Sequence, residues 1–191
     1  SIADQAWSCG LIDRYKAIEK ILAHVRPSDL VLSTTGMISR EVFSTSDRPG
    51  NFYMIGSMGL LSSFGLGLAL MSPEQRVFVV EGDGSALMSL GTLPLIASEE
   101  PTNLVHFILD NESYESTGGQ PTISSRVDLA EVAKSCGYRQ VARVDDIEGL
   151  EGALVAIDGK AGPHLIRVKA GIAPVEGIPR VNIPPTEIRD R

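Results

Sequence analysis

The sequence predicts an α/β fold in which a mostly parallel sheet lies between two layers of helices. Segments with helical spacing of apolar residues alternate with short apolar runs along the chain, which is the pattern of repeated strand–helix units. The apolar runs, such as residues 77–80 and 104–109, are continuous and do not alternate with polar residues. Continuous runs are typical of strands buried on both faces. We therefore expect a three-layer α/β/α sandwich.

The first half of the chain follows this alternation. Residues 12–25 carry apolar side chains at helical spacing, and Pro27 ends that helix. Gly59, Ser63 and Gly67 recur every four residues and give a later helix a smooth face on which another backbone can lie. The elements expected here are a helix at 12–25, a strand at 30–32, a turn at 33–36, a helix at 38–43, a strand at 51–54 and a helix at 57–71.

The second half continues the alternation and contains one long polar loop. Residues 111–126 are too many for a plain connection, so we expect this loop to be functional. We expect one domain over residues 1–170 and an extended, proline-rich tail over 171–191. The other expected elements are strands at 75–81, 103–110, 139–144 and 163–169, and helices at 85–99, 127–136 and 146–158.

Composition limits the class of protein. Apolar residues make up 43% and charged residues 21% of the 191 residues, as in a soluble globular domain. The net charge of −7 disfavours nucleic acid, because a phosphate backbone would be repelled. Two distant cysteines, Cys9 and Cys136, are typical of free thiols in a reducing cytoplasm, and the three histidines lack metal-ligand spacing. We expect no signal peptide and no bilayer-spanning run.

Two polar side chains follow neighbouring strands of the expected sheet. Asp83 lies between two glycines directly after one buried strand, and Asn111 follows the next. Parallel strands end at the same edge of a sheet, where ligands bind, so we expect these side chains to meet. A carboxylate and an amide oxygen suit magnesium, with the backbone carbonyl of Ser113 as a natural third ligand. The expected helix begins at about Ser85, and its free backbone amides point at a diphosphate bound by the magnesium. The Ser85 hydroxyl adds a further donor to that diphosphate.

Each of these residues also has a simpler interpretation. A lone Gly-Asp-Gly is common in turns, and an asparagine is often only a cap. Their joint placement after two buried strands favours a diphosphate cofactor, and hence an enzyme or part of one.

This pattern resembles the diphosphate and magnesium signature of thiamine diphosphate enzymes, and residues 56–59 are similar to a segment just upstream in the same enzymes. The resemblance implies that the Gly56 carbonyl accepts from the 4′-amino group of the cofactor and that Met58 props the cofactor into its bent shape. Core filling is the alternative for Met58. The cofactor-binding residues implied are Gly56, Ser57, Met58, Gly82, Asp83, Gly84, Ser85, Asn111, Ser113 and Tyr114, with Asp83, Asn111 and the backbone oxygen of Ser113 on magnesium.

Three segments, residues 33–41, 51–59 and 114–122, resemble sulfopyruvate and phosphonopyruvate decarboxylases. The resemblance covers roughly residues 12–170, and the length favours the β subunit of sulfopyruvate decarboxylase. In phosphonopyruvate decarboxylase the same half is fused behind a pyrimidine-binding domain, so a subunit or C-terminal fragment of that enzyme is the alternative. A synthase of the acetolactate kind is disfavoured by its greater length. A non-catalytic module that binds magnesium diphosphate also stays open.

The resemblance implies decarboxylation of a small anionic 2-oxo acid, most simply sulfopyruvate to sulfoacetaldehyde and carbon dioxide, with thiamine diphosphate and magnesium as cofactors. The glutamate that activates the cofactor is expected from a pyrimidine-binding α subunit, in a hetero-oligomer or around a homodimer core. No catalytic residue is therefore assigned to this chain.

A sulfonate or phosphonate tail needs hydrogen-bond donors, and Arg40 is the best placed cation. Its alternative is a surface pair with Glu41 or Asp47. The loop offers further donors at Thr117, Gly118, Gly119 and Gln120. Two positions depart from the resemblance: Leu60 stands where relatives often have histidine, and Glu112 stands where they often have glycine and adds negative charge near the site.

Overall fold

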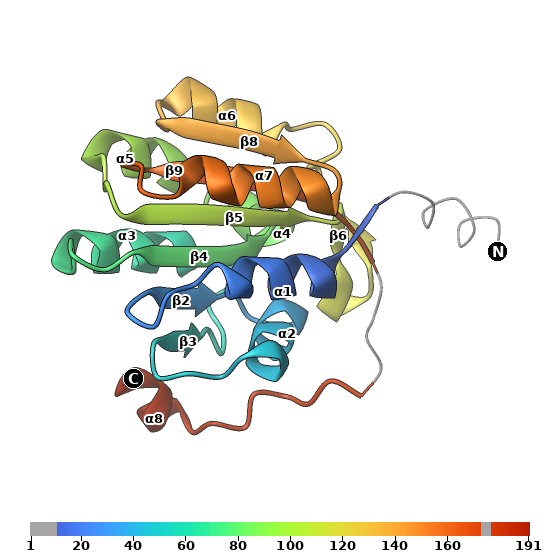
Figure 1. Ribbon diagram of the computed structural model, residues 1–191. Coiled ribbons are helices and arrows are strands. Elements are labelled where there is room, and N and C mark those ends of the chain that lie inside the picture. The colour runs from blue at the N-terminus through green and yellow to red at the C-terminus, as the bar shows by residue number, and fades with distance from the viewer. Residues whose placement is uncertain (1–10, 173–176) are drawn as a thin grey trace.

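A seven-stranded parallel sheet forms the centre of the computed structural model, which describes residues 11–172 and 177–191. The strands run in the order β1-β9-β5-β4-β2-β3, and β8 pairs with β9 beside β1 (Figure 1). Their bounds are β1 Ile12–Asp13, β2 Leu30–Ser33, β3 Asn51–Tyr53, β4 Val77–Gly82, β5 Leu104–Asp110, β8 Gln140–Val144 and β9 His164–Gly171.

Helices cover both faces of this sheet (Figure 1), and each face has its own apolar core. On one face lie α1 (Arg14–Ala23), α2 (Met37–Thr45) and α7 (Ile147–Ile157), and on the other α3 (Leu61–Met71), α5 (Thr92–Glu99) and α6 (Leu129–Cys136). The expected three-layer sandwich is thereby confirmed. Strands β4 and β5 are almost wholly buried, which explains their continuous apolar runs.

The observed bounds of all the expected helices differ from the predicted ones, and for three of them the structure shows the physical reason. Ile12 and Asp13 form a strand with Ala170 and Gly171, and the Asp13 carboxylate caps α1 by accepting from the Tyr15 amide at 2.8 Å. Helix α3 begins at Leu61, not at residue 57, because Ser57 and Gly59 have φ of 55° and 93°, which a right-handed helix does not allow. The single helix expected at 85–99 is two helices, α4 (Asp83–Met88) and α5, which are separated at residues 89–91.

The smooth face expected from Gly59, Ser63 and Gly67 is found at the first two residues only. A Cβ at Gly59 would lie 2.9 Å from Met88 Cβ, and Ser63 Oγ lies 3.0 Å from Thr92 Oγ1. The close approach to the sheet lies at Gly65, where an added Cβ would come within 2.3 Å of Val79 Cγ2. Nothing lies within 4 Å of such an atom at Gly67.

The loop and the tail both contain more structure than expected. The loop 111–126 includes a small hairpin, β6 (Ser113–Tyr114) and β7 (Gln120–Pro121), with a 3-10 turn at Glu115–Thr117 between them. The part of the tail that is described ends in a short helix, α8 (Pro185–Arg189), whose Ile188 is buried in the core beside β3. The expectation of a wholly extended tail is therefore wrong.

Cys136 is a free thiol, whereas Cys9 lies outside the described residues. None of the helices within residues 11–172 and 177–191 has the length and apolarity that crossing a membrane requires.

Candidate active site

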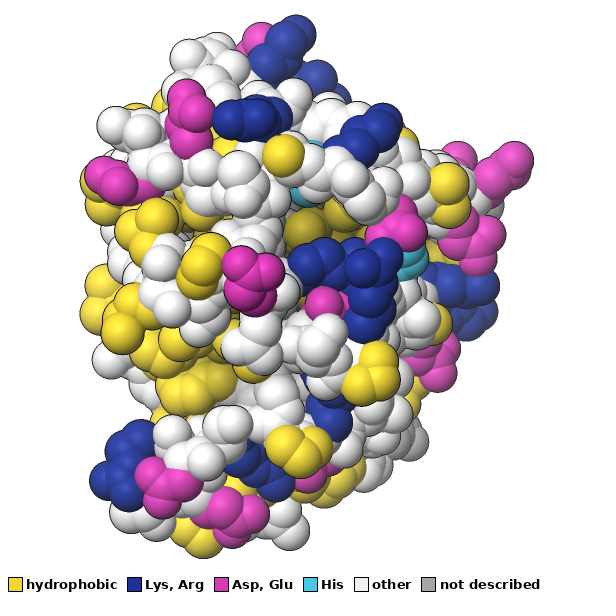
Figure 2. Space-filling view, turned by 60° about the vertical axis from the view of Figure 1, so that its left-hand side comes forward, with side chains coloured by type: hydrophobic (Ala, Val, Ile, Leu, Met, Phe, Trp, Pro, Cys, Tyr) yellow, Lys and Arg dark blue, Asp and Glu magenta, His cyan; other side chains and the backbone are white. Residues whose placement is uncertain are grey.

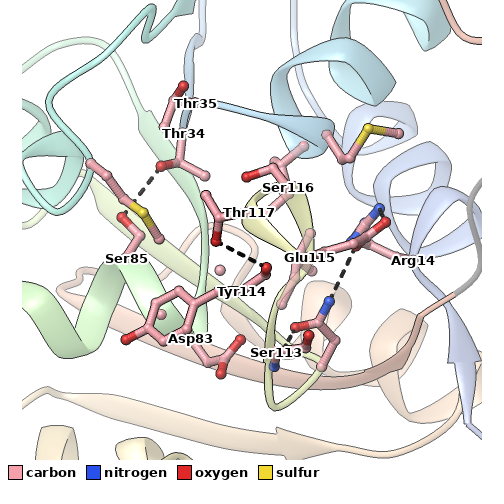
Figure 3. Close-up of a pocket in the computed structure, with 17 residues that line it drawn as sticks. Arg14, Thr34, Thr35, Asp83, Ser85, Ser113, Tyr114, Glu115, Ser116 and Thr117 are labelled. Carbon is pink, nitrogen blue, oxygen red and sulfur yellow. Dashed lines mark hydrogen bonds and ion pairs between the residues drawn. The ribbon is translucent and has the colours of Figure 1, made fainter. Parts of the chain in front are cut away.

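A narrow pocket of about 70 Å³ lies where β2, β4 and β5 end, at their carboxyl edge (Figure 3). In the sheet Gly82 pairs with Leu109, so the residues that follow these two strands leave the sheet side by side. Asp83, Asn111 and Ser113, which the sequence predicts as a magnesium site, all line this one pocket. The expected meeting of the two strand ends is thus what the structure shows.

The carboxylate of Asp83 is buried, with a relative exposure of 1%, and only one of its oxygens has partners. Oδ2 accepts from the Thr122 hydroxyl and from Ser124 Oγ at 2.9 Å, whereas Oδ1 has no hydrogen-bond partner. Burial raises the pKa of Asp83, the Thr122 hydrogen bond opposes that rise, and the charge of Asp110 adds to it. A buried carboxylate oxygen without a partner is costly, and a cation would relieve that cost.

Asn111 and Ser113 present further oxygens to the same pocket. Asn111 Oδ1 accepts from the Ser113 amide at 3.0 Å, and a carbonyl oxygen keeps a second lone pair for another partner. The buried Ser113 hydroxyl has no partner. Across the described residues no group of three or more His, Cys, Asp or Glu side chains could hold a metal, so an ion here depends on this mixed set of oxygens, which suits magnesium.

A hydroxyl and carboxylate network supports Asp83 from behind. Ser124 Oγ lies 2.9 Å from Asp83 Oδ2 and 2.8 Å from Asp110 Oδ1, and Lys169 Nζ lies 3.1 Å from Asp110 Oδ2. The sequence analysis did not single out Thr122 or Ser124 as ligands of Asp83. Both belong to the polar loop that it marked as functional, so the signal was the loop and not the individual hydroxyls.

The same network corrects the expectation for Glu112. Its carboxylate forms an ion pair with Lys169 and does not line the pocket, so its charge is compensated. The φ of 57° at Glu112 lies in the left-handed region that favours glycine. This explains physically why glycine suits the position.

Gly84 and Ser85 both line the pocket, and each also has a contact within the fold. A Cβ at Gly84 would lie 2.4 Å from Cε1 of Tyr114, so only glycine lets that ring lie against the start of α4. Ser85 Oγ donates to the buried Glu81 Oε2 at 2.5 Å and accepts from the Gly59 amide at 3.2 Å. The Ser85 proton is therefore committed to Glu81 and is not free for a phosphate in this conformation.

Glu81 extends this contact into the core. Its Oε1 lies 2.7 Å from His106 Nε2, and both residues are fully buried. The Ser85 hydroxyl thus fixes the segment at Gly59 and is itself fixed by a buried pair on β4 and β5.

The segment 56–59 reaches the pocket through Met58 alone. Met58 lines the pocket, whereas Gly56 and Ser57 are exposed and lie outside it. Leu60, the departure from the resemblance, is 53% exposed.

The candidate substrate residues are separated. Thr117 lines the pocket, and its hydroxyl lies 3.2 Å from Gln120 Oε1. Gly118 and Gln120 are exposed and do not line it. Arg40 lines another cavity, of about 420 Å³, which shares Thr35 with the pocket. Its alternative pairs are taken by other residues, since Glu41 binds Arg14 and Asp47 binds Arg191.

A buried arginine at the pocket edge was missed by the sequence analysis. Arg14 is only 3% exposed and forms two hydrogen bonds to Glu41, from Nε to Oε2 at 2.8 Å and from a terminal nitrogen to Oε1 at 2.7 Å. Its other side binds Glu115, which also accepts from Asn111 Nδ2 at 3.3 Å (Figure 3). Burial lowers the pKa of Arg14, but the hydrogen bonds and charges of both carboxylates outweigh it, so the pKa is raised and the group stays charged.

Comparison with known proteins identifies the family. Residues 34–168 match the family of the thiamine pyrophosphate enzyme, C-terminal TPP binding domain, where pyrophosphate is another word for diphosphate. The chain belongs to this family, as the resemblance predicted.

Two groups of curated relatives are similar over nearly the whole chain. A phosphonopyruvate decarboxylase of Streptomyces hygroscopicus is 45% identical over 93% of this chain and 44% of its own length. The sulfopyruvate decarboxylase subunit beta of Methanothermobacter thermautotrophicus is 44% identical over 95% of this chain and 94% of its own length. The chain thus spans about half of the first relative and nearly all of the second.

A solved structure shows the same fold. The thiamine diphosphate-dependent 4-hydroxybenzoylformate decarboxylase of Rhodococcus jostii RHA1 superposes with a TM-score of 0.73 at 21% identity, over 86% of this chain and 33% of that chain. The residues present here fit a magnesium ion bound together with a diphosphate, because Asp83 Oδ1 is a buried oxygen without a partner beside the oxygens of Asn111 and Ser113.

Proposed function

We propose that this chain is the diphosphate-binding subunit of a thiamine diphosphate-dependent 2-oxo acid decarboxylase, with sulfopyruvate as its substrate. The observation that carries the proposal is the unpartnered Asp83 Oδ1 in a pocket that Asn111 and Ser113 also line. The sulfopyruvate decarboxylase subunit beta of Methanothermobacter thermautotrophicus supports the choice of substrate, since it is 44% identical to this chain over 94% of its own length.

The chain's own residues would hold the cofactor at its diphosphate end. Asp83, Asn111 Oδ1 and the Ser113 carbonyl would bind magnesium, and the magnesium would hold the diphosphate beside Gly84. Gly56 and Met58 would position the rings, Gly56 by its carbonyl and Met58 by its bulk. When bound, thiamine diphosphate supplies a nucleophilic carbon and an electron sink for decarboxylation. Thr122 and Ser124 keep Asp83 in place through Oδ2.

The activating glutamate would come from a partner chain with a pyrimidine-binding domain. Large apolar side chains stand exposed around α3 and α5, among them Leu60, Phe64, Leu70, Met71, Met88 and Leu95. Figure 2 shows hydrophobic side chains gathered on one side of the molecule. Apolar patches of this kind mark protein interaction sites. Leu60, one of these exposed apolar residues, is two positions from Met58 in the sequence.

The proposed activity is tested by reconstitution. The chain is mixed with the pyrimidine-binding subunit of the same organism, thiamine diphosphate and magnesium, and carbon dioxide release from sulfopyruvate is measured. We expect turnover by the mixture and none by either chain alone. Turnover by the isolated chain would contradict the need for a partner, and absence of turnover with any 2-oxo acid would contradict the activity.

Phosphonopyruvate decarboxylation is the second candidate, because a phosphonopyruvate decarboxylase is 45% identical to this chain. The same assay with both substrates decides between them. A kcat/KM that is higher for sulfopyruvate supports the first proposal, and a higher value for phosphonopyruvate replaces it with the second.

A further inference from the structure

We propose that the cavity between α2 and the C-terminal residues 178–188 binds a tetrahedral oxyanion through Arg40 and Arg180, and that this anion is the sulfonate or phosphonate tail of the substrate. The identity of the anion as a substrate tail depends on the function proposed above. The new residue is Arg180, which no part of the sequence analysis marked.

The cavity is large enough for a small acid and adjoins the candidate active site at Thr35. Its volume of about 420 Å³ falls within the range of small-molecule sites, about 300–1,000 Å³. Thr35 lines both this cavity and the pocket that contains Asp83. In Figure 3 Thr35 lies on the opposite side of the pocket from Asp83. A ligand in the cavity would therefore lie next to the Thr35 end of the pocket, away from the proposed metal at Asp83.

The C-terminal segment that carries Arg180 is held against the sheet. Val181 and Ile183 are partly buried against the core, and Ile188 of α8 is 3% exposed. All three also line the cavity, so the segment forms its wall. Arg180 itself is exposed, and Arg40 is half-buried on α2.

Among the residues that the structure describes, the two arginines are exceptional in having no anionic partner. Nine of the chain's twelve arginines bind a carboxylate or a backbone carbonyl. Within residues 11–172 and 177–191, only the side chains of Arg40, Arg126 and Arg180 have neither. Two of these three line one cavity, and no acidic residue is among the described residues that line it. In a chain of net charge −7 this is a strong local excess of positive charge.

The other polar side chains of the cavity are already occupied. Ser39 Oγ donates to the Thr34 carbonyl at 2.6 Å, and Thr35 Oγ1 donates to the Ile55 carbonyl at 3.2 Å. The Tyr53 hydroxyl donates to Asp47 Oδ1 at 2.8 Å. The guanidinium groups are therefore the donors that remain for a ligand.

The position of Arg40 on α2 strengthens the positive field. Helix α2 has nine residues, begins after Gly36 without a side-chain cap, and has no acidic residue in its first turn. Arg40 stands close to that end, where the helix dipole is itself positive and disfavours a cation. An anion in the cavity would be stabilised by both arginines and by the dipole. Arginine suits sulfonate and phosphonate oxygens, because its planar donors can bind two of them at once.

The test uses the assembled enzyme with the variants Arg40→Gln, Arg180→Gln and the double variant. Arg126→Gln is the matched control, because Arg126 is equally without a partner but lines a different cavity. We expect each single variant to raise the KM for sulfopyruvate or phosphonopyruvate at least about tenfold, since each removes a charge-assisted hydrogen bond. The Arg126→Gln variant keeps the wild-type KM. A double variant with wild-type KM in an active enzyme overturns the inference.

A binding measurement separates this inference from the proposed function. The melting temperature of the full chain, saturated with magnesium and thiamine diphosphate, is measured with inorganic phosphate against chloride of equal ionic strength. We expect phosphate to stabilise the wild type and Arg126→Gln but not the double variant. If the assembled enzyme decarboxylates neither acid, the proposed function fails, and this phosphate effect alone decides on the anion site. Phosphate stabilisation that is lost in the double variant while KM stays unchanged identifies a free-phosphate site and contradicts the substrate-tail assignment.

Discussion

The Asp83→Asn variant should lose the stabilisation that magnesium and thiamine diphosphate give the chain, while its cofactor-free form should be at least as stable as the wild type. The carboxylate is buried and its Oδ1 has no partner. Its charge therefore destabilises the cofactor-free fold, whereas in the presence of magnesium the same oxygen is a metal ligand. At a ligand concentration of 100 times Kd we expect the wild type to gain about 2.7 kcal/mol, or about 5–11 °C in Tm. The variant should gain nothing measurable.

The matched control for this experiment is Asp145→Asn, because Asp145 is 70% exposed and its ion pair within the described part of the chain is with Arg167. It should keep the ligand-induced rise in Tm. A full rise in the Asp83→Asn variant would remove Asp83 from the metal site.

The pH dependence of the same measurement carries a definite sign. Burial raises the folded-state pKa of Asp83 above its ordinary value of 3.8. The folded chain therefore binds the proton more tightly than the unfolded chain. Stability of the cofactor-free wild type due to this group is present below pH 3.8 and is lost as pH rises to the folded pKa. Metal binding needs the ionised carboxylate, so the ligand-induced rise in Tm should grow over the same window.

The Arg14→Leu variant should lose about 3–5 kcal/mol of unfolding free energy, because it leaves two carboxylates without their shared cation. Glu41 is fully buried and Glu115 is 17% exposed, so neither charge is well solvated. Urea unfolding measures the loss. The Arg143→Leu control removes an arginine that also bridges two carboxylates, Asp128 and Glu131, but on the surface. It should cost about 1 kcal/mol or less.

A second variant keeps the Arg14 result interpretable. Adding Glu41→Gln to Arg14→Leu removes one of the stranded charges, so part of the lost stability should return. Equal losses for Arg14→Leu and Arg143→Leu would contradict the view that this buried cluster fixes the loop residue Glu115 to the body of the protein.

The sequence predicted the sheet well because its strands are marked by local patterns. Strands β4 and β5 are continuous apolar runs, and a run of that kind needs no knowledge of its partner. Strand β1 has only two residues and exists because Ile12 and Asp13 pair with a strand more than 150 positions away. Periodicity assigned those two residues to the helix that follows.

The start of α3 was missed for a conformational reason. Ser57 adopts φ of 55°, although serine has no strong preference for the left-handed region. Ser85 donates to Glu81 and accepts from the Gly59 amide, which holds this turn in place. These are tertiary contacts, and no local signal near residue 57 reports them.

In the candidate site, too, the residues with a local sequence signal were predicted and those that depend on tertiary contacts were not. Asp83 and Asn111 were predictable because each follows a strand directly, and parallel strands end at one edge. Arg14 was not, since it meets Glu41 and Glu115 across 27 and 101 positions of sequence. Arg14 lies on a helix, and the spacing of apolar residues in that helix predicts only that position 14 is polar. Thr122 belongs to the segment 114–122 that resembles the decarboxylases. Its contact with Asp83 was not predictable, because it depends on how the loop folds back onto the strand ends.

The central claim, that a divalent ion bridges this site and a diphosphate, is tested most directly by a crystal structure of the chain with magnesium and thiamine diphosphate. We expect the ion to lie about 2.0–2.1 Å from Asp83 Oδ1, Asn111 Oδ1 and the Ser113 carbonyl oxygen. A complex in which Asp83 Oδ1 stays free of the ion, or in which the diphosphate binds away from Gly84, would contradict the claim.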